Sequence, residues 1–226
     1  MAERLAPWVW VGAAALACVA GIVNVVGFLG FQHQAITHLT GNTSLLGAAI
    51  VSGDLRGAWH LFGAIAAFVV GAALSGLIIQ DSTLRLGRRY GVVLSLEAIL
   101  LLAAVPLFQR GYIGGVLCAA VACGLQNAMA TTYSGAIVRT SHLSGMFTDL
   151  GIMLGHAARG MPLALRRLQM CMLVIAFFFI GGVAGAGLFA AIGYDALYLP
   201  AALTGITGVA YTAYRQRALM REGVRR

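Results

Sequence analysis

The stretch ITHLTGNTSLLG, residues 36–47, is polar in a chain whose residues are 60% hydrophobic. A second stretch, TSHLSGMFTDLG at residues 140–151, repeats its pattern. The histidine, both leucines of H-L and L-G, and both glycines are identical, and at three further positions one hydroxyl side chain replaces another. So close an agreement predicts that the chain contains two copies of one structural unit.

Matches on either side of this motif extend the duplication. They are Gly21 and Asn24 in AGIVN against Gly124 and Asn127 in CGLQN, Arg56-Gly57 against Arg159-Gly160, and FVVGAALSGLI from Phe68 against FIGGVAGAGLF from Phe179. We therefore expect one membrane domain over residues 1–226. It would consist of repeat 1 at about residues 8–108, repeat 2 at about residues 112–214, and a basic cytoplasmic tail at residues 215–226.

The composition is that of an integral membrane protein. Mean hydropathy is +0.89 with 10% charged residues, against about 25% charged in an average soluble domain. Long apolar runs favour helices over a β-barrel, whose strands would be short and alternating. We expect transmembrane helices at about residues 8–29, 59–79, 92–108, 112–132, 170–192 and 197–214. Two shorter segments, at about residues 41–53 and 145–156, would cover too little of a ~30 Å hydrocarbon core to cross it untilted.

The arginines favour a topology. All 15 basic residues are arginine, the net charge is +8, and arginines in short loops concentrate on the cytoplasmic side. Six spans with cytoplasmic termini would place thirteen arginines inside and only Arg56 and Arg110 outside. Eight spans would give a weaker bias of eleven to four. Because three spans per repeat is an odd number, six spans also predict two inverted-topology repeats. We expect a basic membrane protein of this kind to bind no nucleic acid.

Two smaller features have plain interpretations. The first run is expected to be a retained span, because a signal peptide would begin with a positive segment and this chain begins with one acid and one base. The four cysteines lie in apolar runs without metal-ligand spacing, so we expect free thiols, no metal site and no cofactor.

The duplicated motif is the candidate functional site. Irregular backbone at membrane depth is buried in protein or lines a wet cavity. Thr40 and Ser144 are expected helix N-caps, and the positive N-terminal ends of two short re-entrant helices would face each other near the midplane, where they favour anions. The expected substrate path comprises His38, Thr40, Gly41, Asn42, Thr43, His142, Ser144, Gly145, Thr148 and Asp149. Alternatively, such polar residues serve only as interhelical hydrogen bonds.

Four further residues form a second tier: Asn24, Glu97, Gln126 and Asn127. Acids within the membrane are costly and mark functional candidates. Glu97 and Asp149 would each either accept a proton during coupled transport or pair with a neighbouring histidine or arginine.

The expected function is a transporter or channel for a small polar or anionic solute, whose path lies at the interface of two inverted repeats in the lipid bilayer. A homo-oligomer is compatible with the sequence. The alternatives are a non-transporting assembly or sensory protein and, less favoured, an intramembrane hydrolase built on Ser144 and a histidine. We expect no enzyme, because Ser144 and His142 lie too close along the backbone to form the required hydrogen bond easily.

HLTGNTSLLG, GLQNA and TSHLSGMFTDLG together resemble the YoaK-like family of bacterial polytopic membrane proteins, a family of unknown function. The resemblance covers nearly the whole chain, and residues 40–43, T-G-N-T, are its most specific part. Asn24 stands where that family more often carries an acid, which weakens a proton-coupling role there. The resemblance implies a multi-pass helical protein of the bacterial inner membrane, and it implies no substrate.

Overall fold

The computed structural model describes residues 7–31, 36–79, 89–134 and 139–223, and within these ranges all regular structure is helical. The helices are α1 (Pro7–Gly30), α2 (Leu39–Ser52), α3 (Leu55–Ile78), α4 (Arg89–Gln109), α5 (Gly114–Tyr133), α6 (Leu143–Ala158), α7 (Leu165–Ile192), the 3-10 helix η1 (Gly193–Leu197) and α8 (Tyr198–Gly223). The six long expected helices and the two short ones are thus present.

The long helices make this a multi-pass membrane protein. Five helical stretches among the described residues are long and apolar enough to cross a bilayer, the last of which, Leu165–Tyr214, runs through α7, η1 and most of α8. Large apolar side chains lie on the outer faces of these helices, such as Leu77 at 74% and Phe179 at 68% exposure. Lipid is the solvent that such faces require.

The two halves pack through matched helix crossings. Gly21 of α1 lies against the Phe178 carbonyl of α7, and Gly124 of α5 lies in the same way against the Phe68 carbonyl of α3. A side chain at either glycine would overlap backbone atoms, so the close approach depends on the missing Cβ. The first helix of each half therefore packs on the third helix of the other half.

A second matched pair fixes the alignment of the halves. Gly71 of α3 packs on Val121, and Gly181 of α7 packs on Cys18. These contacts equate Phe68 with Phe178, so the sequence alignment of Phe68 with Phe179 was wrong by one residue. The apolar patterns of the two segments fit either register, whereas the close backbone contact allows only one.

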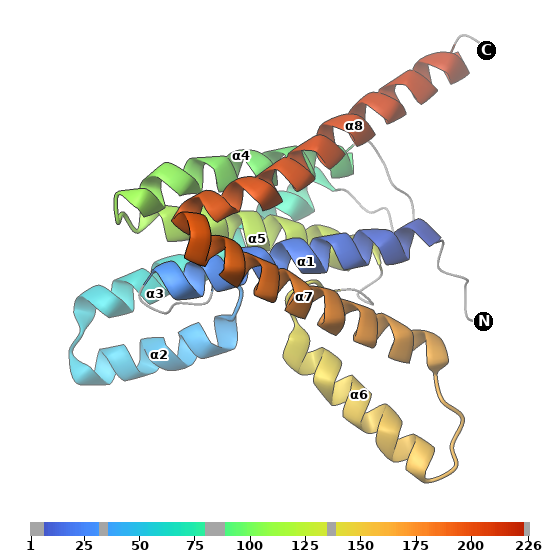
Figure 1. Cartoon of the computed structure of the whole chain (residues 1–226), viewed down its shortest axis with the longest axis horizontal. Helices are drawn as coiled ribbons and strands as arrows, with labels where there is room; N and C mark the ends of the chain where they lie inside the picture. Colours follow the sequence, from blue (N-terminus) through green and yellow to red (C-terminus); the bar gives the residue numbers. More distant parts are fainter. Residues whose placement is uncertain (1–6, 32–35, 80–88, 135–138, 224–226) are drawn as a thin grey trace.

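Helix directions follow from the same contacts. α1 and α7 run parallel, because Cys18 and Ile22 contact Gly181 and Gly185 in the same order. α4 and α8 run antiparallel, because Gly91 contacts Gly208 whereas Ala98, further along α4, contacts the earlier Gly205. Figure 1 shows the opposite directions of α4 and α8.

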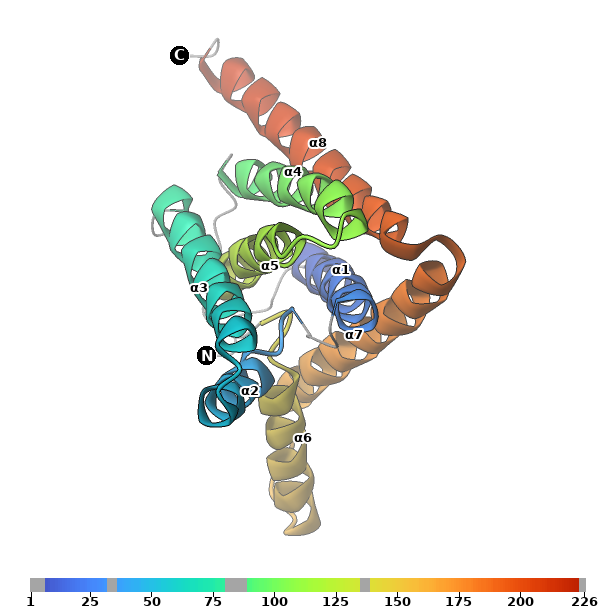
Figure 2. The ribbon, with the colours of Figure 1, turned by 90° about the vertical axis from the view of Figure 1, so that its left-hand side faces the viewer.

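The arrangement is layered around α1 and α5. Figure 2 shows these two helices at the centre, with α3 and α7 on the two flanks. α4 and α8 lie on one side of the central pair, and α2 and α6 lie on the other (Figures 1 and 2). The buried core joins the central helices to α3 and α4 through side chains such as Val26, Leu101 and Phe108.

The short helices α2 and α6 are peripheral. Their 14 and 16 residues correspond to about 21 and 24 Å at about 1.5 Å per residue, less than a hydrocarbon core of about 30 Å. Each forms a hairpin with the helix that follows it. Both begin near the centre of the molecule and diverge from there (Figure 1).

Candidate functional site

A cavity of about 730 Å³ lies where α2 and α6 begin. Both halves of the chain line it, and six pairs of equivalent residues face it. The pairs are Asn24 with Asn127, Thr37 with Ser141, His38 with His142, Leu39 with Leu143, Thr40 with Ser144, and Phe68 with Phe178. The structure therefore brings the two copies of the H-L-[ST]-G motif together around one space.

Of the ten residues expected to line the substrate path, four line this cavity: His38, Thr40, His142 and Ser144. Two second-tier residues, Asn24 and Asn127, line it as well. The other expected path residues lie in α2 and α6 and do not line the cavity.

The histidines, and not the hydroxyl residues, stand at the helix N-caps. α2 begins after His38 and α6 begins after His142, so the assignment of Thr40 and Ser144 as N-caps was wrong by two residues. Neither histidine side chain makes a capping hydrogen bond. The first amide groups of both helices thus carry their partial positive charge toward the cavity without a side-chain cap.

Each imidazole ring lies over the glycine three residues later. A Cβ at Gly41 would be 2.7 Å from His38 Nε2, and a Cβ at Gly145 would likewise overlap the His142 ring. These glycines do not line the cavity. Their role is to leave room for the ring, which holds each histidine at the helix entrance.

This packing predicts an unusual response to alanine. Gly→Ala inside a helix ordinarily stabilises by about 0.5–1 kcal/mol. At Gly47 and Gly151, equivalent positions where a Cβ meets nothing within 4 Å, we expect that gain. Gly41→Ala and Gly145→Ala should show no gain, because the new methyl group displaces the histidine ring. Thermal unfolding of the four variants in detergent measures this, and an equal gain at all four would contradict the ring position.

The remaining motif side chains bond within their own helices or turn away. Thr43 Oγ1 donates to the Leu39 carbonyl at 2.8 Å, and Thr148 Oγ1 donates to the Ser144 carbonyl at 2.9 Å. Asn42 is 2% exposed and faces the protein interior. None of these three lines the cavity. The two hydroxyl groups, bonded one turn back, lie along their helices and not beyond the N-termini.

Asp149 has an ionic partner outside the cavity. Its carboxylate accepts from Arg167 of α7 at 2.9 Å, in a pair whose side chains are 31% and 62% exposed. Asp149 was expected either to accept a proton or to pair with a histidine or arginine, and in the structure it pairs with an arginine. Such an exposed pair contributes little to stability.

The segments before α2 and α6 are tied to the central helices in two different ways. Asn24 Oδ1 accepts from both the amide and the hydroxyl of Thr37, at 3.0 and 2.8 Å. In the second half Gln126 Oε1 accepts from the Thr140 hydroxyl at 3.1 Å. Compared with the first half, the acceptor and the donor of this hydrogen bond each lie one residue earlier in the second half. The Asn127 side-chain oxygen, equivalent to that of Asn24, is consequently left without a partner among the described residues.

Sequence reasoning missed several polar residues of the site, including Thr37, Ser141 and, as the one charged member among the described residues, Arg139. Arg139 lines the cavity beside Ser141 and His142 and is solvent-exposed. It was counted only as a topology signal, although its position directly before T-S-H-L-S-G could have indicated it. Arg139 adds a full positive charge to a cavity that already receives two helix N-termini.

Glu97 and Gln126 lie outside the cavity, in the interior. Gln126 Nε2 donates to Glu97 Oε1 at 2.8 Å, and Glu97 is 1% exposed. Together with Thr140 they form a buried chain between α4, α5 and the segment that precedes α6.

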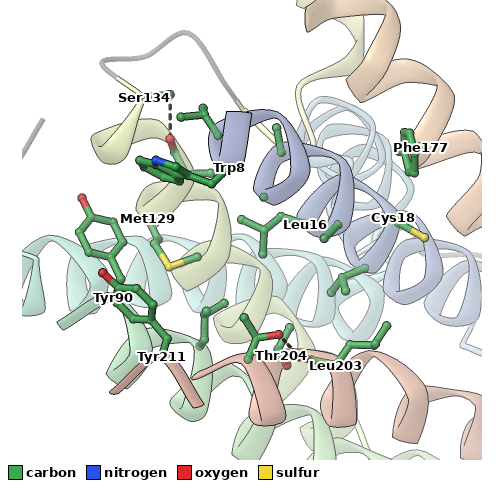
Figure 3. A pocket seen from close by; sticks show the side chains of 18 residues that line it. Trp8, Leu16, Cys18, Tyr90, Met129, Ser134, Phe177, Leu203, Thr204 and Tyr211 are labelled. Carbon is green, nitrogen blue, oxygen red and sulfur yellow. Dashed lines mark hydrogen bonds between the residues drawn. The ribbon is translucent and has the colours of Figure 1, made fainter. Parts of the chain in front are cut away.

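A second cavity, of about 420 Å³, has an apolar lining (Figure 3). Trp8 and Leu16 of α1 face it with Met129 of α5 and Leu203 of α8. Its few hydroxyl groups are engaged: Thr204 Oγ1, for example, donates to the Pro200 carbonyl. Of these two cavities, the one at the duplicated motif has the more polar lining.

Comparisons with known proteins place the chain in a family. No curated protein and no solved structure matches it. The family model described as "Protein of unknown function (DUF1275)" matches residues 12–210, which includes both copies of the motif. The expected membership in a family of unknown function is thereby confirmed. The chain belongs to the DUF1275 family.

Proposed function

We propose that this protein moves a small anion across the bacterial inner membrane, along a path that passes the cavity between the two H-L-[ST]-G motifs. The observation that carries the proposal is the convergence of two helix N-termini and the Arg139 side chain on one open cavity. Backbone amides at helix N-termini and an arginine are the groups that bind anions in proteins.

The binding groups come mainly from the second half. Arg139 and Ser141 belong to it, whereas in the first half the Thr37 hydroxyl already donates to Asn24. A small oxyanion would receive donors from Arg139, the Ser141 hydroxyl and the exposed helix amides. The histidines would add a donor or acceptor on either side.

Six spans in two inverted repeats are part of this proposal. Parallel halves, as eight spans require, would make α4 and α8 parallel, but their contacts run antiparallel. The short lengths of α2 and α6 and the arginine bias support the same topology. With both termini cytoplasmic, α2 would enter from outside and α6 from inside, so that the two N-termini meet within the membrane.

The hydrolase alternative receives less support from the geometry. A serine nucleophile needs a base within hydrogen-bonding reach. The His142 ring lies against Gly145, and no hydrogen bond from Ser144 to a histidine is found among the described residues. A solute-binding role accounts for both groups without a reaction.

The electrostatic part of the proposal can be tested at Ser141. In a protein whose four cysteines are replaced by alanine, Ser141→Cys places a thiol on the cavity wall. The measured quantity is the rate of the anionic reagent MTSES divided by the rate of the cationic reagent MTSET. We expect this ratio to be roughly tenfold higher at Ser141→Cys than for a free thiol, because one nearby charge changes the local potential by about 1 kcal/mol or more.

Ser52→Cys is a matched control, since this exposed residue lies at the far end of α2. It should show no such preference. A ratio of MTSES to MTSET rates at Ser141→Cys below that of a free thiol would exclude an anion site, and no reaction with either reagent would mean that the motif serves only in packing.

A further inference from the structure

Glu97 is a buried acid that the anion site does not use. It lies on α4 with 1% exposure, and its Oε1 accepts from Gln126 at 2.8 Å. Its Oε2 has no hydrogen-bond partner among the described residues. The ion pair found within those residues joins Arg167 to Asp149, and none of the described arginines forms an ion pair with Glu97.

The fold does not require an acid at this place. The first half ties the segment before α2 to α1 with Asn24 and Thr37 alone. The second half makes the corresponding tie with Gln126 and Thr140. Glu97 is not needed for the hydrogen bond between Thr140 and Gln126. A charged or unsatisfied carboxyl group in an apolar interior costs free energy.

The chain of hydrogen bonds connects Glu97 with the cavity. Thr140 donates to Gln126, Gln126 donates to Glu97, and Thr140 directly precedes Ser141 and His142 on the cavity wall. A change at the carboxyl group therefore acts on the residue that holds the entrance of α6. Buried polar networks transmit such changes because each member has few alternative partners.

We propose that Glu97 is the proton-binding site that couples a proton to the movement of the anion. The step is a simple exchange, in which the Glu97 carboxylate takes one proton from water and releases it to water after the entrance of α6 has moved. This inference rests on the proposed anion transport. A negative charge on Glu97 and an anion in the cavity repel each other, so proton and anion favour each other's binding reciprocally.

Other titratable groups face this region. Cys123 of α5 faces Glu97. On α8, the residues that cross α4 beside Ala98 and Ser95 are Gly205 and Gly208, which have no ionisable side chain. Arg139, His38 and His142 lie in the cavity beyond Thr140. Because several ionisable groups lie in this region, the test compares pH profiles with and without the Glu97 carboxyl group.

The ratio of MTSES to MTSET rates at Ser141→Cys gives that profile, because thiol ionisation affects both reagents and cancels in the ratio. In the protein with Glu97 intact we expect the anion preference to increase roughly tenfold from alkaline to acidic pH, as a negative charge near the cavity is neutralised. Glu97→Gln should remove the part of this dependence that the carboxyl group contributes and hold the preference near its acidic value. Glu97→Asp should restore the dependence.

Infrared spectroscopy supplies a readout that needs no reagent. The carbonyl band of a protonated carboxyl group should titrate in the wild-type protein, vanish in Glu97→Gln and persist in Asp149→Asn. A band unaffected by Glu97→Gln, or identical pH profiles with and without the carboxyl group, would overturn the proton site. If MTSES is not preferred even in the Glu97→Gln variant, the anion site itself fails, which is a different result.

Discussion

Gly181→Leu is expected to destabilise the protein by roughly 3 kcal/mol or more, so that most of it would be unfolded in mild detergent. Gly181 lies where α7 crosses α1, and a Cβ there would be 2.8 Å from the carbonyl carbon of Cys18 and in hard overlap with its oxygen. Backbone atoms of a packed helix cannot rotate aside as a side chain can. The two helices would have to separate.

The neighbouring residue provides the control. A Cβ at Gly182 meets nothing within 4 Å, so Gly182→Leu should cost less than about 1 kcal/mol. Fluorescence-detected size exclusion after heating separates the two variants. The equivalent Gly71→Leu, which would overlap Val121 at the α3–α5 crossing, should behave like Gly181→Leu. Equal stability of the Gly181 and Gly182 variants would contradict the crossing.

Arg139→Glu is expected to reverse the charge preference of the cavity. Wild-type Arg139 lines the cavity with Ser141 and His142, and the substitution changes the local charge by two units. At separations of several Å, each unit corresponds to about 1 kcal/mol or more. The ratio of MTSES to MTSET rates at Ser141→Cys should therefore fall by roughly a hundredfold, and MTSET should become the faster reagent.

Arg159→Glu makes the same change of charge outside the cavity. Arg159 is exposed and follows the C-terminus of α6, at the far end from His142. This variant should keep the preference for MTSES within about a factor of two, since exposed charges beyond a Debye length of about 10 Å are screened. If both variants lower the ratio equally, overall charge and not the cavity determines the preference.

The sequence predicted the helices and the pairing of the two motifs well. Hydrophobic runs long enough to span a bilayer and a repeated H-L-[ST]-G pattern are properties of the chain itself. From these two properties one can predict that two short helices begin at the same place, without any knowledge of side-chain contacts.

What the sequence could not predict are the directions of individual side chains. Asn42 points inward and Thr43 bonds one turn back because of how α2 lies on its neighbours. Residue type alone made Thr40 a better N-cap than His38, but the ring of His38 fits over Gly41. Arg139 and Arg167 look alike in sequence, and only the fold distinguishes the cavity arginine from the partner of Asp149.

The most direct test of an anion path between inverted repeats is the labelling of Ser141→Cys by MTSES from each side of sealed, oriented vesicles. The path predicts reaction from the cytoplasmic side and, as the protein changes conformation, also from the opposite side. In both cases the ratio of MTSES to MTSET rates should exceed that of a free thiol. A thiol that MTSES reaches from neither side would contradict the account, because the cavity would then be no part of a path across the membrane.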